Sequence, residues 1–291
     1  MSAGMVSATD RGLAFGDGLF ETLFVHRGRP VALAEHLTRL RVGLARLGLP
    51  EPAFESIMTA IEEAVGPDAS TGVCKLVVTA GTGPRGYRRP ADPNPSIRAT
   101  FGPLPSPPAQ ELAVDLSPVT LAGAAPLRGL KHLNRLVQVL AQEALPAERS
   151  EALMTDGAGR VVSGTMSNLF WRERDGWHTP PLVDGAIAGT RRAWLIERLE
   201  AQVTPCAVGR LALADAAFLS NALSAWRPVG RLLGRSLACG VPPGAALTVI
   251  DGFWQPEEVN AANPWPASLS EAMNDTCWGR MARREGIQTR P

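Results

Sequence analysis

Lysine is almost absent from this 291-residue chain. Only Lys75 and Lys131 are lysines, although lysine and arginine together number 29. An arginine side chain stays protonated in proteins and cannot form an imine, so chemistry that needs a free amine side chain has only two candidates. Because the chain uses arginine almost everywhere a cation is needed, a retained lysine is a candidate for a task that arginine cannot perform.

Metal-binding, disulfide and membrane-spanning patterns are also missing. The four cysteines, Cys74, Cys206, Cys239 and Cys277, form no Cys-x-x-Cys pair and have no histidine at ligand spacing, which argues against a structural zinc, any other metal site or a disulfide framework. The start of the chain lacks the pattern of a signal peptide, and no run approaches 18 apolar residues. We therefore expect a cytoplasmic protein with reduced thiols and no membrane partner.

The charges nearly cancel, because 28 acidic residues face the 29 basic ones. Such a balance gives no overall field that would attract nucleic acid or an anionic membrane. With 45% apolar residues the chain is too hydrophobic for a disordered protein. The composition favours a folded protein that acts on a small molecule.

Strands and helices mix along the chain without strict βαβ alternation. This order predicts an α+β fold with mixed sheets in two domains. The proline cluster between Pro103 and Pro108 marks the boundary between residues 1–104, a small N-terminal domain, and 105–259, a larger C-terminal domain. Weak periodicity over residues 260–291 predicts an irregular tail. Helices are expected over 33–47, 55–65 and 188–200, with one more beginning near Lys131.

Gly81 to Gly86 fits the G-x-G-x-x-G pattern of dinucleotide-binding loops and follows an apolar strand. That pattern must open a helix, whereas several prolines follow here and prevent one. We therefore interpret this segment as a loop that carries Arg85 and Tyr87. Its Arg85 guanidinium is suited to bind a carboxylate.

Three further positions could carry chemistry. Lys131 is expected in the first turn of its helix, where the dipole and burial would lower its pKa; a solvated lysine is the alternative, which lysine scarcity disfavours. Arg39 lies three residues after His36 on a leucine-striped helix, and is either a surface cation or a phosphate ligand. The small-residue turn from Gly185 to Arg191 runs into a helix, whose free N–H groups bind either an anion or water.

Together these stretches resemble the fold-type IV pyridoxal-phosphate enzymes, which are the class IV aminotransferase family, and within it most closely the aminodeoxychorismate lyase branch. The Lys-His-Leu-Asn-Arg run that begins at Lys131 is more typical of the lyases than of the transaminases. The segments that carry the resemblance are 11–22, 36–39, 81–87, 129–135, 167–171 and 220–223.

The resemblance implies a D-amino-acid aminotransferase-like fold, with residues 105–259 as the cofactor-binding domain, and a homodimer. It also implies pyridoxal 5'-phosphate as cofactor, with Lys131 as the catalytic lysine that forms the imine with it and Arg39 as a phosphate ligand. Arg85 and Tyr87 would contact substrate. The phosphate cup would be completed around four residues, namely Thr190, Arg191, Asn221 and Ala222.

Two departures from the family pattern stand out. The glutamate that the family usually places against the pyridine nitrogen is replaced by Ser163, which cannot hold that nitrogen protonated by charge. The chain also reaches the Arg11 motif early, so an opening edge strand is missing or the start codon is misassigned.

Ser163 weakens a transaminase more than a lyase, because a transaminase must delocalise a full carbanion into the ring. We therefore expect a carbon–oxygen lyase of folate biosynthesis that forms 4-aminobenzoate and pyruvate from 4-amino-4-deoxychorismate. The alternatives are a D- or branched-chain amino-acid aminotransferase and a degenerate, non-catalytic binding protein.

Overall fold

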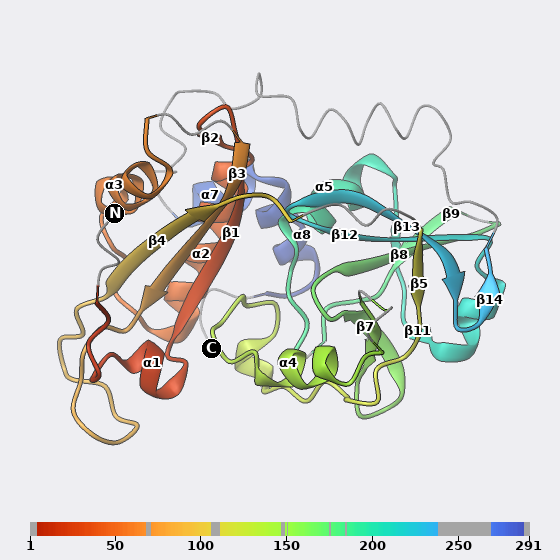
Figure 1. The fold of residues 1–291 in the computed structure, drawn as a ribbon, viewed down its shortest axis with the longest axis horizontal. Coiled ribbons are helices and arrows are strands. Elements are labelled where there is room, and N and C mark those ends of the chain that lie inside the picture. Colours follow the sequence, from red (N-terminus) through yellow and green to blue (C-terminus); the bar gives the residue numbers. More distant parts are fainter. Residues whose placement is uncertain are drawn as a thin grey trace.

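The structure is a computed structural model that describes residues 5–67, 71–105, 111–146, 149, 151–174, 176–183, 185–237 and 269–287. Two assemblies of sheet and helix lie side by side in it (Figure 1). Residues up to Gly102 build one four-stranded sheet, and residues from Leu112 onward build two further sheets. The end of the proline-rich boundary, 106–110, lies outside the described residues.

The first sheet is antiparallel throughout, with the strand order β2-β1-β3-β4. Helices α2 and α3 cover one of its faces (Figure 1). The elements of this part are α1 (Arg11–Phe15), β1 (Gly18–His26), β2 (Arg29–Pro30), α2 (Leu33–Leu47), α3 (Phe54–Val65), β3 (Thr71–Thr79) and β4 (Ser96–Gly102).

Helix α2 forms as its leucine spacing predicts. Leu37, Leu40 and Leu44 recur at three- or four-residue intervals and are each 1% exposed, so they form one stripe against the sheet. Gly48 ends the helix with φ of 63°, a left-handed conformation that glycine adopts without a steric penalty. The same helix brings His36 and Arg39 to the interior.

The second part contains a seven-stranded sheet and a three-stranded sheet. Parallel pairs between β9 and β10 and between β5 and β13 occur beside antiparallel ones, which confirms the prediction of an α+β fold with mixed sheets. Its strands are β5 (Leu112–Val114), β6 (Leu153–Thr155), β7 (Arg160–Gly164), β8 (Asn168–Glu173), β9 (Gly176–Thr179), β10 (Gln202–Val203), β11 (Cys206–Ala207), β12 (Ala216–Asn221), β13 (Ser224–Leu232) and β14 (Arg235–Ser236). Its helices are η1 (Ala125–Leu127), α4 (Leu136–Glu143), α5 (Thr190–Arg198) and η2 (Val208–Leu213).

The end of the chain departs from the irregular tail that the sequence predicts. Residues 269–287 form α7 (Leu269–Asp275) and α8 (Cys277–Arg284), and α8 packs against both α2 and α5 (Figure 1). Trp278 on α8 is completely buried, and Arg192 of α5 forms a buried ion pair with Glu285. These contacts come from residues far apart in sequence, which is why periodicity alone misses them. Residues 260–268 and 288–291 of the predicted tail lie outside the described residues.

Within the described part of the chain, no helix has both the length and the apolar character needed to cross a membrane. The same residues contain no group of three or more histidine, cysteine, aspartate or glutamate side chains arranged to hold a metal ion.

Candidate active site

Lys131 lies in an extended segment that pairs with the start of β1. The carbonyl of Lys131 accepts a hydrogen bond from the Phe20 N–H at 2.9 Å, and Leu133 N–H donates to the Gly18 carbonyl at 3.0 Å. Helix α4 begins only at Leu136, so the prediction that Lys131 occupies the first turn of a helix is wrong. Pairing with β1 holds residues 130–133 extended and delays the helix.

The Lys131 amine is nevertheless perturbed, for a different reason. Burial and the nearby Arg39 guanidinium lower the pKa of Lys131 to about 7, although Glu21 acts in the opposite direction. The amine also lies 4.2 Å from the centre of the Phe20 ring. The Lys131 amine therefore loses its proton at a lower pH than an ordinary lysine, and the neutral amine is the form that attacks a carbonyl.

Arg39 is held by a buried network that reaches both parts of the fold. Its Nε donates to Glu21 Oε1 at 2.8 Å, and its Nη1 donates to the Ala188 carbonyl at 2.8 Å. The second Glu21 oxygen lies 2.6 Å from His36 Nδ1. Burial alone would raise the pKa of Glu21, but Arg39 and His36 reduce it to about 2, so this carboxylate stays charged. Arg39 is thereby fixed as an inward-facing cation.

One pocket, which we call the lysine pocket, contains Lys131, Arg39 and the start of α5. Helix α5 begins at Thr190 after the N-cap residue Gly189, and its first N–H groups have no partner inside the helix. The six residues that the resemblance implies for cofactor binding line this pocket, and so does Ser163 at the expected position of the ring nitrogen. Its lining is Arg39, Lys131, Gln138, Ser163, Gly164, Thr165, Met166, Ser167, Asn168, Gly185, Ile187, Gly189, Thr190, Arg191, Asn221 and Ala222.

The residues of the predicted phosphate cup are held by local contacts. Asn221 Oδ1 accepts the N–H groups of Leu223 and Ser224, both at 3.0 Å, which shapes the turn after β12. Arg191 is 1% exposed and donates to the Ala222 carbonyl at 3.3 Å. Burial lowers the pKa of Arg191. This wall of the lysine pocket therefore combines helix N–H groups with a guanidinium, a combination suited to an anion.

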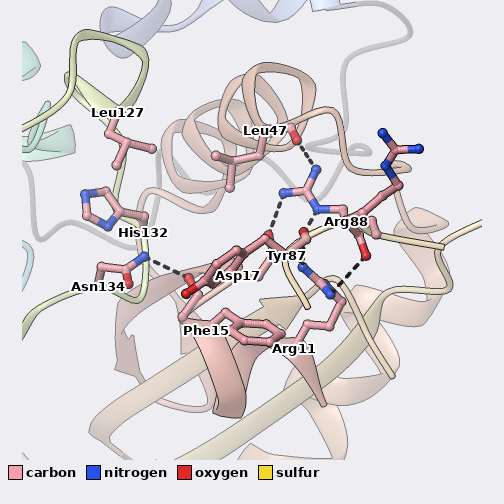
Figure 2. A pocket seen from close by; sticks show the side chains of 12 residues that line it. Arg11, Phe15, Asp17, Leu47, Tyr87, Arg88, Leu127, His132 and Asn134 are labelled. Carbon is pink, nitrogen blue, oxygen red and sulfur yellow. Dashed lines mark hydrogen bonds and ion pairs between the residues drawn. The ribbon is translucent and has the colours of Figure 1, made fainter. Parts of the chain in front are cut away.

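A larger cavity of about 610 Å³, which we call the arginine cavity, is a different place. It is lined by Arg11, Phe15, Gly16, Asp17, Gly18, Leu47, Tyr87, Arg88, Arg89, Leu127, His132 and Asn134 (Figure 2). Arg11 and Arg89 both bind Asp17, and Arg11 also donates to the Tyr87 carbonyl at 2.7 Å. These contacts shape the loop between β3 and β4. The cavity has no lysine, so we assign the chemistry to the lysine pocket.

The structure does not bring Arg85 and Tyr87 to the lysine pocket of their own chain. Both are exposed on the loop between β3 and β4, and Tyr87, 87% exposed, borders the arginine cavity (Figure 2). The Lys-His-Leu-Asn-Arg run contributes to both pockets. Lys131 lines the lysine pocket, whereas His132 and Asn134 line the arginine cavity. Asn134 donates to the Gly16 carbonyl at 3.1 Å and so joins this run to β1.

Among the described residues, no aspartate or glutamate lines the lysine pocket. Ser163, which stands where the family usually has a glutamate, donates its hydroxyl to the Gly164 carbonyl at 2.8 Å. The carboxylate behind this wall is Glu151, which is 1% exposed and accepts hydrogen bonds from Ser167 Oγ and Met166 N–H. Glu151 also pairs with Arg227. Its carboxylate oxygens are paired with residues of the pocket wall, and Glu151 itself does not line the pocket.

Sequence reasoning missed Glu21 and Glu151 and assigned no task to Lys75. Glu21 could have been found, because it is a charged residue on the core-facing side of β1, between buried Leu19 and Leu23. Lys75 is exposed, and its Nζ lies 5.2 Å from the centre of the same Phe20 ring that Lys131 contacts. The two lysines of the chain therefore share one aromatic neighbour. Glu151 gives no pattern in the sequence, since its partners come from the turn before β8 and from β13.

The lysine pocket fits pyridoxal 5'-phosphate. An aldehyde needs a neutral amine, which Lys131 provides, and a phosphate needs cations and N–H donors, which Arg39 and the start of α5 provide. Gly189 also lines this pocket. A Cβ atom at Gly189 would lie 2.1 Å from Asn168 Oδ1, which is too close for any side chain. A residue larger than glycine would displace the turn that precedes α5.

Comparisons with known proteins agree with this geometry. Residues 18–232 match the amino-transferase class IV family. The chain is 30% identical to the aminodeoxychorismate lyase of Vibrio harveyi over 76% of this chain and 84% of that one. It is 27% identical to the D-alanine aminotransferase of Bacillus licheniformis over 81% and 86% of the two chains. The crystal structure of 4-amino-4-deoxychorismate lyase from Pseudomonas aeruginosa superposes with a TM-score of 0.77 at 36% identity, covering 86% of this chain and 95% of that one.

The lowered pKa of Lys131 predicts how its reactivity depends on pH. In a Lys75→Arg chain freed of cofactor, Lys131 is the only lysine left to react with an amine-specific acylating reagent. Because the neutral amine reacts, we expect its modification rate to rise with pH around a midpoint near 7, measured by mass spectrometry of the Lys131 peptide. In the urea-unfolded chain the midpoint should move to about 10.4, the ordinary value for lysine. Equal midpoints in the two states would contradict the assignment.

Proposed function

This chain belongs to the class IV aminotransferase family, and on that premise we propose that it is an aminodeoxychorismate lyase. The reaction would convert 4-amino-4-deoxychorismate into 4-aminobenzoate and pyruvate, a step of folate biosynthesis. The observation that carries the proposal is a neutral-amine lysine in one pocket with an anion-binding helix start, in a chain similar over most of its length to named lyases. Pyridoxal 5'-phosphate is the cofactor of the family.

The residues of the lysine pocket divide the work between binding and proton transfer. Arg39 and the first N–H groups of α5 would hold the cofactor phosphate. When bound, the cofactor supplies an electrophilic carbonyl for the substrate amine and a ring that withdraws electrons. Lys131, released by the incoming substrate amine, would take the proton from the ring carbon that carries that nitrogen.

Loss of this proton drives the rest of the reaction. The electron pair of the broken C–H bond forms a ring double bond, and the neighbouring C–O bond breaks with its pair on the leaving enolpyruvate oxygen. The carbocycle thereby becomes aromatic, and the enolpyruvate takes up a proton to become pyruvate. Lys131 would then be free to hold the cofactor again once 4-aminobenzoate has left. A single residue thus anchors the cofactor and acts as the base.

We also propose that the protein works in the cytoplasm. Its described cysteines, Cys74, Cys206 and Cys277, are free thiols, which suits a reducing compartment.

The proposed dimer follows from an exposed apolar surface and from the position of the loop between β3 and β4. Leu136, Val139 and Leu140 of α4 are 69%, 51% and 52% exposed and lie within one turn of each other, so a second copy of the chain would bury them. Because Arg85 does not line the lysine pocket of its own chain, we propose that Arg85 and Tyr87 contact substrate in the pocket of the partner subunit.

The lyase assignment predicts a specific pair of products. The purified enzyme, supplied with chorismate and the amidating synthase, should form 4-aminobenzoate and pyruvate in equal amounts. Lys131→Ala should lower the rate by at least about a thousandfold, the range lost with a general base. Lys75→Arg is the matched control, because it removes the other amine and keeps its charge. Transfer of an amino group to 2-oxoglutarate without release of pyruvate would identify a transaminase instead. Formation of neither product would identify the non-catalytic binding protein.

Ser163, at the position where the family usually has a glutamate, predicts a latent second activity. Ser163→Glu would place a negative charge where the ring nitrogen lies, keep that nitrogen protonated and strengthen electron withdrawal. We expect transamination from D-alanine or a branched-chain amino acid to rise at least about tenfold, which corresponds to about 1.4 kcal/mol of barrier. Ser163→Gln, similar in size but neutral, is the control. No rise in Ser163→Glu with cofactor still bound would refute this role for position 163.

A mixed dimer tests whether Arg85 acts across the interface. Lys131→Ala and Arg85→Gln chains are each expected to be impaired as homodimers. If each pocket uses Lys131 of one chain and Arg85 of the other, random exchange gives hybrids with one intact pocket, and about a quarter of the native rate should return. If Arg85 serves its own chain, every hybrid pocket carries one defect and no rate returns.

A further inference from the structure

The C-terminal helix α8 reaches the rear of the lysine pocket. Trp278 Nε1 donates to the Ala188 carbonyl at 2.9 Å, and this is the same oxygen that accepts the bond from Arg39. Trp278 and Ala188 are both 0% exposed, so water does not compete for these bonds. Two buried donors, one from α2 and one from α8, therefore converge on a single peptide group.

That peptide group leads directly into the proposed phosphate cradle. In a trans peptide the C=O and the following N–H point in opposite directions, so fixing the Ala188 carbonyl also fixes the direction of the Gly189 N–H. Gly189 lines the lysine pocket and is the N-cap residue of α5. The other side of this turn is set by Gly129, whose N–H donates to the Ala186 carbonyl at 2.9 Å and whose carbonyl accepts the Ala188 N–H at 3.0 Å.

Helix α8 is itself held against α2, the helix that carries Arg39. Both oxygens of Glu35 accept N–H groups from the first turn of α8, at 3.0 Å from Cys277 and 2.8 Å from Trp278. At the other end of α8, Ile287 packs over Gly129, where a Cβ atom would lie 2.7 Å from the Ile287 side chain. The segment 276–287 thus contacts the turn before α5 and the segment that leads to Lys131.

We propose that Trp278 is a positioning residue for the cofactor phosphate, acting through the Ala188 carbonyl to orient the N–H groups at the start of α5. Trp278 does not line the lysine pocket, so it has no direct contact with a bound ligand there. Its effect falls on the proposed anion-binding groups, because the Ala188 carbonyl bonds Arg39 and the Ala188 peptide continues into Gly189, the N-cap residue of α5.

A comparison of two ligands tests this specificity. Pyridoxal lacks the phosphate of pyridoxal 5'-phosphate but carries the same aldehyde, so the ratio of their dissociation constants isolates the phosphate contribution. In the full-length chain freed of cofactor, Trp278→Phe keeps most of the buried ring and removes the donor. We expect the dissociation constant for pyridoxal 5'-phosphate to rise about three- to tenfold, the effect of one lost hydrogen bond, while that for pyridoxal changes less than about twofold.

Trp171→Phe is the matched control. Trp171 is also completely buried and donates its indole N–H to a side chain, Glu173 Oε1 at 2.7 Å, but it does not line the lysine pocket. This variant should leave the ratio for the two ligands within about twofold of the native value. A purely structural effect of losing a buried indole would appear in both variants.

A second variant covers the case in which Trp278→Phe does not fold. Glu35→Gln keeps Trp278 but replaces one of the two carboxylate oxygens that hold the start of α8, and it should shift the same ratio in the same direction. The proposal is overturned if the foldable variant binds pyridoxal 5'-phosphate as the native chain does, or if it loses affinity for pyridoxal equally. Neither result depends on which reaction the enzyme catalyses. Failure of the proposal for Trp278 can therefore be distinguished from failure of the lyase assignment.

Discussion

The buried contacts of Arg39 are the constraint on which the rest of the site depends. A guanidinium removed from water is costly unless its charge and donors are matched, and Glu21 together with the Ala188 carbonyl provides that match. Glu21 belongs to β1, Arg39 to α2, and Ala188 to the turn before α5. One side chain therefore joins the first sheet, the helix that covers it and the turn before α5, so that the lysine pocket forms where the two parts of the fold meet.

The amine of Lys131 acquires its chemistry from the same arrangement. The segment around Lys131 is extended by pairing with β1, which brings the amine beside Phe20 and close to Arg39. Burial and that neighbouring cation, rather than a helix dipole, lower the pKa of Lys131 to about 7. The pocket combines this amine with the Arg39 guanidinium and the N–H groups at the start of α5. Ser163 in its lining, in place of a glutamate, distinguishes this chain from the usual pattern of its family.

Local patterns in the sequence were sufficient where local physics decides the structure. The leucine stripe of α2 and the small-residue turn before α5 predicted those helices to within two residues, because spacing and capping act over a few residues. The resemblance to the class IV aminotransferases identified residues between Arg39 and Ala222 in the sequence that line one pocket in the structure. What these patterns missed depends on distant partners: α4 starts late because Lys131 pairs with β1, and α8 is buried because Glu35, more than 200 residues earlier, binds its first turn. The exposed position of Arg85 likewise follows from the folded chain and not from its motif.

The account rests on Lys131, rather than Lys75, as the residue that binds the cofactor. The most direct measurement is borohydride reduction of the enzyme loaded with pyridoxal 5'-phosphate, followed by digestion and mass spectrometry of the two lysine-containing peptides. The pocket geometry predicts one reduced cofactor group per chain, on the peptide that contains Lys131. A modified Lys75 peptide, or an unmodified Lys131 peptide from enzyme that carries the cofactor, would contradict it.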